Sequence, residues 1–235
     1  MTRIGLYPAV AAVLAATLFF PSHSTAQTVA LSSTDGLQAH HVTVDAVTYQ
    51  GRPAVRVLPA VPADKEKETM KNGEGGGIVV LQGSEFRDGT IEVDVAGKPR
   101  PGAVPDARGF VGVAFRVAAD LTKYECFYVR PTNGRAEDQV RRNHSAQYIS
   151  MPEYEWARLR KEAPERYESY VDLVPGEWTK LKIVVKGLQA WLFVGDAPQP
   201  ILIVNDLKHG ETQGQVALWI GLGSEAYFSN LRITR

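Results

Sequence analysis

The residue types best suited to chemistry gather in one stretch of the chain, residues 124–148. Tyr124, Tyr128 and Arg130 occupy alternate positions, so they would project from one face of a strand. Tyrosine rings pack on apolar ligand surfaces while their hydroxyls hydrogen-bond, and arginine offers a planar fork of donors. This pattern predicts a polar-aromatic binding surface. Ordinary packing with exposed rims is the alternative.

A turn and a run of charges follow that strand and contain Arg142, Asn143 and His144. Fixed positive charge, an amide and an imidazole that titrates near neutral pH suit a polyhydroxylated or acidic ligand. If the run folds back over the strand, these three residues and Tyr148 would extend the binding surface. His144 would then be a candidate general acid or base. The alternative is a solvated loop without a catalytic role.

Glu92 and Asp94 also share one face of an expected strand, which makes them candidates for acid–base work. The alternative to this catalytic interpretation is that the two residues form a solvent-facing pair on an antiparallel sheet. Arg116 ends a strand on which Gly112 and Ala114 share its face, and small residues there would allow a ligand to approach. For Arg116 the alternative is a structural ion pair with Glu92 or Asp94.

Alternating apolar and polar residues recur along most of the chain and predict about eleven short antiparallel strands. Such a series indicates an all-β sandwich or barrel. Two segments break the alternation. Residues 62–76 are charged and glycine-rich, as in a loop. Residues 135–170 form a long insertion that is rich in aromatic residues, so we expect it to be ordered against the domain, with a short helix over residues 155–163.

The chain has 235 residues, 44% of them apolar, and a formal net charge of zero. The balanced charge argues against a nucleic-acid partner. Residues 1–26 have the basic start, apolar run and small residues of a secretory signal, so residues 27–235 would form one soluble domain, secreted or periplasmic, without a membrane span. A membrane anchor is the alternative. The single cysteine, Cys126, excludes an internal disulfide.

No spacing of histidines, cysteines or acidic residues predicts a metal site, and no cofactor is expected. His40 and His41 are adjacent and would point to opposite faces of a strand. A structural calcium ion bound by backbone and Asp oxygens stays compatible with the sequence. The sequence gives no prediction of the oligomeric state.

The sequences of five expected strand segments resemble those of the concanavalin A-like lectin/glucanase superfamily. The resemblance is to its laminin-G-like and 3-keto-disaccharide hydrolase-like (family-16-like glycoside hydrolase) groups in particular. The segments are residues 86–95, 109–116, 178–185, 214–219 and 226–233, so the resemblance spans roughly residues 28–235. It implies an antiparallel jelly-roll β-sandwich whose concave face binds sugar. Because this fold carries both lectins and enzymes, the resemblance says less about chemistry than about fold.

Family-16 glycoside hydrolases carry a Glu-x-Asp-x-x-Glu motif, and Glu92 and Asp94 match its first two positions while Gly97 occupies the third. The usual acid/base residue is therefore missing, and the sequence leaves open whether the protein is an enzyme. The main hypothesis is a secreted protein that binds and cleaves a glycosidic bond through the polar-aromatic patch. A non-catalytic, lectin-like glycan-binding module is the first alternative, and a structural or adhesive sandwich that binds protein is the second.

Overall fold

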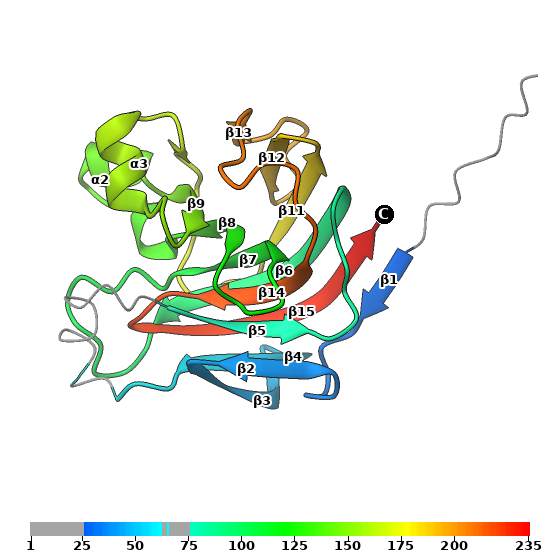
Figure 1. Ribbon diagram of the computed structural model, residues 1–235. Coiled ribbons are helices and arrows are strands. Elements are labelled where there is room, and N and C mark those ends of the chain that lie inside the picture. The colour runs from blue at the N-terminus through cyan, green and yellow to red at the C-terminus, as the bar shows by residue number, and fades with distance from the viewer. Residues whose placement is uncertain (1–25, 63–64, 66–75) are drawn as a thin grey trace, which may run out of the picture.

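The computed structural model describes residues 26–62, 65 and 76–235 (Figure 1). The expected signal segment therefore lies outside the described residues except for Ala26. Most of the expected loop at 62–76 lies outside them as well. Among the described residues, we find no helix whose length and apolar character would suffice to cross a membrane.

One sheet, sheet A, has eight strands in the described part of the chain. In spatial order they are β13 (Leu202–Val204), β12 (Gln189–Val194), β11 (Thr179–Lys186), β6 (Gly89–Pro99), β15 (Ser224–Thr234), β4 (Arg52–Pro59) and β3 (Val42–Tyr49), with β1 (Ala26–Val29) also paired to β15. Alternate residues of β6 are buried and half-buried, as the alternating sequence predicts.

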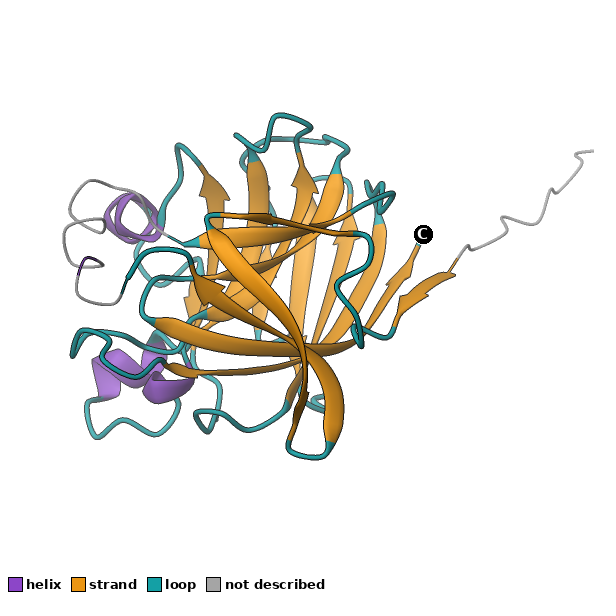
Figure 2. Cartoon of the chain, turned by 90° about the horizontal axis from the view of Figure 1, so that it is seen from below, coloured by secondary structure: helices purple, strands orange, loops and turns teal. Residues whose placement is uncertain are grey.

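The second sheet, sheet B, has seven strands among the described residues. Their order is β10 (Glu168–Ser169), β9 (Ala146–Met151), β8 (Tyr124–Val129), β7 (Val111–Val117), β14 (Gln215–Ile220), β5 (Gly77–Leu81) and β2 (Leu37–His40). The strand pairs of both sheets run antiparallel, which confirms the predicted all-β sandwich of the jelly-roll type (Figure 2).

The hydrophobic core lies between the two sheets. Contacts across it show which face of each strand points inward. A Cβ atom added to Gly97 of β6 would lie 2.4 Å from the carbonyl oxygen of Gly109 and 2.6 Å from Cγ1 of Val111. Val111, Val113 and Phe115 of β7 therefore face sheet A, and Gly112 faces outward. The same contact explains why no acidic side chain occupies position 97, because the opposite sheet fills that space.

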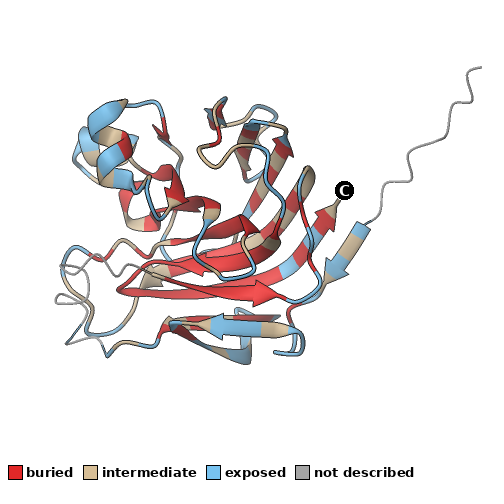
Figure 3. Ribbon diagram, viewed as in Figure 1, coloured by how far each residue is buried: buried red, intermediate tan, exposed pale blue. Residues whose placement is uncertain are grey.

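The segment expected as an insertion, residues 135–170, is partly built into sheet B. After a short 3₁₀ helix, η2 (Pro131–Asn133), come α2 (Gln139–Asn143), strand β9, α3 (Trp156–Glu162) and strand β10. The expected short helix is confirmed as α3, whereas β9 and β10 are strands that the charged sequence concealed. Figure 1 places both helices beside β9, and Figure 3 shows their exposed outer sides next to nearly fully buried strands of sheet B.

Candidate functional site

A cavity of about 750 Å³ opens on the outer face of sheet B, beside α2 and α3. We call it the helix-capped pocket. Its floor is formed by Phe110, Tyr128, Ile149, Met151, Trp219 and Leu222. Its rim includes Arg108, Arg141, His144, Glu155, Trp156 and Arg160. The volume falls within the range of roughly 300–1,000 Å³ that is usual for ligand sites.

The floor depends on a glycine in the middle strand. Gly112 of β7 lies directly between Trp219 of β14 and Tyr128 of β8. Because Gly112 has no side chain, the two rings reach across β7 and stack, with their centroids 4.6 Å apart. The indole Nε1 of Trp219 donates to the Tyr124 hydroxyl at 3.3 Å. The result is a fixed aromatic surface assembled from three strands.

Arg130 forms hydrogen bonds that connect the floor of the pocket to the residues after α2. Its Nη1 donates to the carbonyl oxygen of His144 at 2.9 Å and to Glu168 at 3.2 Å, and its Nη2 donates to the Tyr128 hydroxyl at 2.8 Å and to Gln147 at 3.0 Å. The residue is 5% exposed. Its terminal donors are thus used within the protein, and Arg130 organises the pocket more than it offers donors to a ligand.

Glu168 is the buried carboxylate behind the rim, with a side chain only 2% exposed. Burial opposes its ionisation, but a hydrogen bond from Arg160 and the charges of Arg130 and Arg160 lower its pKa below the ordinary value. Nε2 of His144 lies 3.6 Å from the same carboxylate. Burial, together with the charges of Arg160 and Arg130, outweighs the attraction of Glu168 and lowers the pKa of His144. Behind the rim, an ionised carboxylate therefore lies beside the neutral imidazole of His144.

Two further arginines shape the rim. Arg141 of α2 donates from Nε to Asn133 at 2.9 Å and from Nη2 to the Thr132 hydroxyl at 3.0 Å. Arg108 donates to Asp106 at 2.9 Å. Burial and the nearby charge of Arg108 lower the pKa of Arg141. At the mouth, the guanidinium of Arg160 lies 4.8 Å from the ring centroid of Trp156, one helical turn earlier in α3.

Three of the residues singled out in the sequence meet at this pocket: Tyr128, Arg130 and His144. Tyr124 lies beside it and supports Trp219 through the hydrogen bond described above. Burial raises the pKa of Tyr128 to about 12 and raises that of Tyr124 as well, so both hydroxyls are neutral. The strand face expected to carry the binding surface therefore does line a cavity.

Tyr148, Arg142 and Asn143 lie elsewhere. Tyr148 is fully buried and sits opposite Phe127 on the core side of sheet B, where its hydroxyl donates to Glu125. Arg142 donates to the Tyr170 hydroxyl at 3.0 Å on the outside of the molecule, and exposed Asn143 accepts from Gln139. The expectation that these residues fold over the strand face is corrected, because β9 turns Tyr148 inward and α2 directs the other two away.

Arg116 is also outside the pocket. A register shift in β14 opposite this part of β7, together with a φ of 53° at Arg116, rotates the side chain out of the expected alternation. The side chain is 0% exposed and pairs with Asp88 at 3.1 Å, while its other donors reach the carbonyl oxygens of Arg87, Gly187 and Gly210. It is a structural ion pair, as the alternative held, although the partner is Asp88 and not Glu92 or Asp94.

Glu92 and Asp94 project from the outer face of sheet A, on the other side of the sandwich from the helix-capped pocket. Glu92 faces Lys182 and Arg232 on the neighbouring strands. Asp94 accepts hydrogen bonds from Arg52 and Asn230, each at 2.8 Å. The three residues considered for catalysis are therefore not brought together, since His144 lies at the end of α2, beside the opposite sheet.

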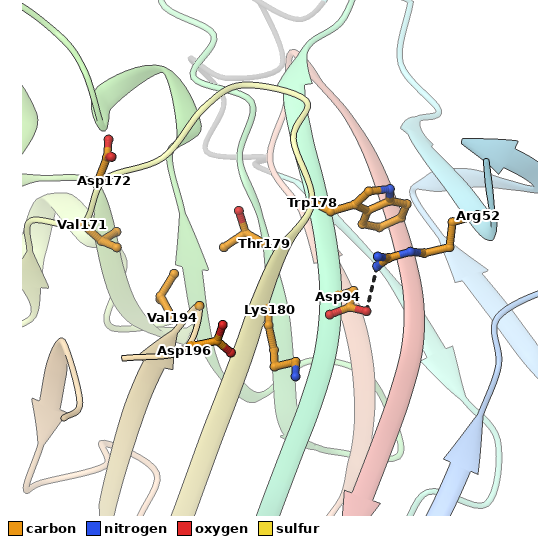
Figure 4. Close-up of a pocket in the computed structure, with 10 residues that line it drawn as sticks. Arg52, Asp94, Val171, Asp172, Trp178, Thr179, Lys180, Val194 and Asp196 are labelled. Carbon is orange, nitrogen blue, oxygen red and sulfur yellow. Dashed lines mark hydrogen bonds and ion pairs between the residues drawn. The ribbon is translucent and has the colours of Figure 1, made fainter. Parts of the chain in front are cut away.

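Asp94 borders a second, shallower hollow of about 570 Å³ at the ends of β6, β11 and β12 (Figure 4). We call it the Asp94 hollow. It is lined by Arg52, Asp94, Trp178, Thr179, Lys180 and Asp196, among others. In Figure 4 Arg52 reaches Asp94 past the Trp178 ring, and its guanidinium lies 4.8 Å from the ring centroid.

The sequence analysis did not single out the pocket residues Trp219, Trp156 and Arg160, nor Glu168 behind the rim. Trp219 ends the alternation of residues 214–219, so its outward direction was visible in the sequence, but its partner strand was not. Arg160 lies four residues after Trp156, a spacing that marks one helix face. No group of three or more potential metal-binding side chains occurs in the described part of the chain.

No protein-family model matches the sequence, and no curated protein matches it. Among solved structures, the chain is similar to the carbohydrate binding module CBM66 from Bacillus subtilis, with 14% identity, a TM-score of 0.56, and coverage of 84% of this chain and 95% of that one. A Bacillus subtilis protein of unknown function with a galectin-like fold gives 10% identity, a TM-score of 0.57, and coverage of 88% and 94%.

A third similar structure is the Crh5 transglycosylase in complex with NAG, with 12% identity, a TM-score of 0.52, and coverage of 88% of this chain and 83% of that one. At such identities the likeness concerns the fold and not the chemistry. The resemblance to the concanavalin A-like lectin/glucanase superfamily is thus confirmed at the level of the fold.

Proposed function

We propose that this protein binds a glycan in the helix-capped pocket and acts outside the cytoplasm as a non-catalytic, lectin-like module. The observation that carries the proposal is the composition of that pocket: the exposed ring of Trp156 lies among the arginines of the rim, above a largely aromatic floor, and two arginines balance the charge of the buried carboxylate. Aromatic side chains combined with a few fixed polar groups suit sugars, which have apolar faces and many hydroxyls.

The chemistry of Glu168 favours binding over hydrolysis. Retaining hydrolysis uses two carboxyl groups about 5–5.5 Å apart, one of them protonated so that it can act as an acid. Glu168 has a lowered pKa between Arg130 and Arg160, so it is a poor proton donor. Glu92 and Asp94 cannot assist it from the outer face of sheet A.

The fold neighbours point in the same direction. One is a carbohydrate binding module, one has a galectin-like fold, and one is a transglycosylase in complex with NAG. A glycan ligand is consistent with all three. The predicted signal at residues 1–26 supports action outside the cytoplasm.

Glycosidic-bond cleavage is the second candidate, and one contact favours it. Neutral His144 lies at the pocket rim, 3.6 Å from the ionised Glu168, and an imidazole held beside a carboxylate can act as a general base. Such a base would have to act without the paired carboxyl groups of the standard mechanism.

A glycan panel that records binding and product release on the same samples separates the two candidates. The proposal predicts saturable binding without product. Product release that is lost in His144→Gln while binding is retained would establish the enzyme instead. Arg142→Ala, a change on the outer side of α2, is the matched control and should alter neither readout. Absence of binding to every glycan would refute both candidates.

A further inference from the structure

The floor of the helix-capped pocket differs in chemistry from its rim, and this difference specifies the ligand. Building on the proposed glycan-binding function, we infer that the pocket takes a glycoside whose sugar lies at the rim and whose apolar substituent, an aryl or acyl group, fills the floor. The site thus distinguishes a substituted glycan from the corresponding unsubstituted sugar.

The side-chain polar groups of the floor already have hydrogen-bond partners within the protein. The Tyr128 hydroxyl accepts from Arg130 at 2.8 Å, and the Trp219 indole donates to Tyr124 at 3.3 Å. Arg130 makes four hydrogen bonds within the protein through its two terminal nitrogens. A sugar hydroxyl placed on the floor would leave its water partners and find few replacements, which costs free energy.

The remaining floor surface is apolar. Ile149 and Met151 project from β9 beside the aromatic pair, and Phe110 lies edge-on to Tyr128 with the ring centroids 6.1 Å apart. Trp219 and Tyr128 stack on each other and are only 5% and 3% exposed, so little of either ring is free for a sugar to cover. An apolar group that fills this space gains free energy by leaving water.

The rim, in contrast, still has groups to offer a sugar. Nη1 of Arg141 and Nη1 of Arg160 have no hydrogen-bond partner within the described residues, although the other nitrogens of both side chains are used. Trp156 is 45% exposed at the mouth, so part of its ring surface is free to contact a pyranose. The carboxylate of Glu155, next to it, is an exposed acceptor.

The volume of the pocket permits both parts of such a ligand. About 750 Å³ is within the range of drug-sized sites, so a sugar unit and an attached ring or short acyl chain fit together. The floor and the rim are continuous in one cavity. A single ligand can therefore contact both.

The test compares methyl and phenyl glycosides of the same sugars, namely glucose, galactose, mannose and N-acetylglucosamine, with phenol alone as a third probe, by calorimetry on the purified protein. For any sugar that binds, we expect the phenyl glycoside to bind at least about tenfold more tightly than the methyl glycoside. Phenol alone should bind much more weakly than the phenyl glycoside.

Met151→Gln adds an amide to the floor at nearly constant size and should abolish most of the phenyl preference. Arg142→Ala should leave it intact. Unfolding curves of both variants establish that they are folded. Because the ligand series is also measured on the unchanged protein, the inference remains testable if Met151→Gln fails to fold.

Equal affinity for methyl and phenyl glycosides would overturn the inference and leave the glycan-binding proposal standing. Phenol that binds as tightly as its glycosides would overturn the glycan-binding proposal, because the sugar would then contribute nothing. No binding by any probe would count against both. The two failures are therefore distinguishable.

Discussion

The two hollows of the molecule lie on opposite sheets, and both contain an arginine, an acidic group and a tryptophan. Behind the rim of the helix-capped pocket the ion pair is buried: the Arg130 and Glu168 side chains are 7% and 2% exposed. In the Asp94 hollow, the Arg52 and Asp94 side chains are 38% and 16% exposed. Similar residues therefore form a fixed site where helices cover the face of a sheet, and a solvated surface where the face is open.

The covering comes from the segment between β8 and β10. It adds β9 to sheet B and places α2 before that strand and α3 after it, so that water is excluded from the Arg130–Glu168 ion pair behind the rim. An exposed ion pair contributes little to stability, whereas a buried one becomes costly to break.

Replacing Arg130 with alanine should have the largest effect. It removes one of the two arginines that pair with the buried Glu168 carboxylate and leaves Gln147 Oε1 without its donor, so we expect a loss of about 3–5 kcal/mol in the free energy of unfolding. Arg52→Ala in the Asp94 hollow is the matched control and should cost less than about 1 kcal/mol. Urea denaturation measures both. Similar losses in the two variants would remove the contrast between the hollows.

Gly112→Ala should disturb the pocket floor. The added Cβ would lie 2.2 Å from the carbonyl oxygen of Phe127 and 2.5 Å from Cβ of Tyr128, so the strands must shift. We expect a loss of about 1–3 kcal/mol in the free energy of unfolding, as is typical of overpacking. Glycan binding should weaken in parallel because the stacked rings move. Unchanged stability and binding would show that the floor does not depend on this glycine.

Acidification should destabilise the protein through the pocket. The folded state lowers the pKa of His144 below its ordinary 6.5 and that of Glu168 below its ordinary 4.5. The unfolded chain therefore binds more protons as the pH falls past each value, and stability is lost, first below 6.5 and further below 4.5.

The variants His144→Gln and Glu168→Gln assign these two steps when unfolding is followed against pH. Each substitution should remove the loss of stability that its own residue causes on acidification. Stability that rises on acidification between pH 6.5 and 4.5 would contradict the account of His144, and stability that rises below 4.5 would contradict that of Glu168.

Much of the fold followed from the alternation of residues, because a half-buried strand imposes period two wherever it occurs. The same rule correctly predicted that Tyr128 and Arg130 share one face, which the structure shows to be the outer face of sheet B. It also holds for Tyr148, which points inward because it lies opposite Phe127, but β9 was hidden within a charged segment. Once β9 is recognised, the inward direction of Tyr148 follows from its pairing.

Other parts of the site depended on information that no local pattern contains. Trp219 meets Tyr128 only because β14 and β8 both pair with β7, and such long-range pairing is set by the whole sheet. Arg116 left its expected face because of a local shift in register and a positive φ. Periodicity cannot predict such an irregularity, which inverts the direction of a side chain.

The central claim is that glycans bind at the helix-capped pocket and not at the Asp94 hollow. The most direct measurement is the affinity of one panel glycan for Trp156→Ala and for Trp178→Ala, determined by calorimetry. We predict at least about a tenfold loss for Trp156→Ala, because aromatic contacts dominate such sites, and little change for Trp178→Ala. A loss confined to Trp178→Ala would contradict the account and place the ligand on the opposite sheet.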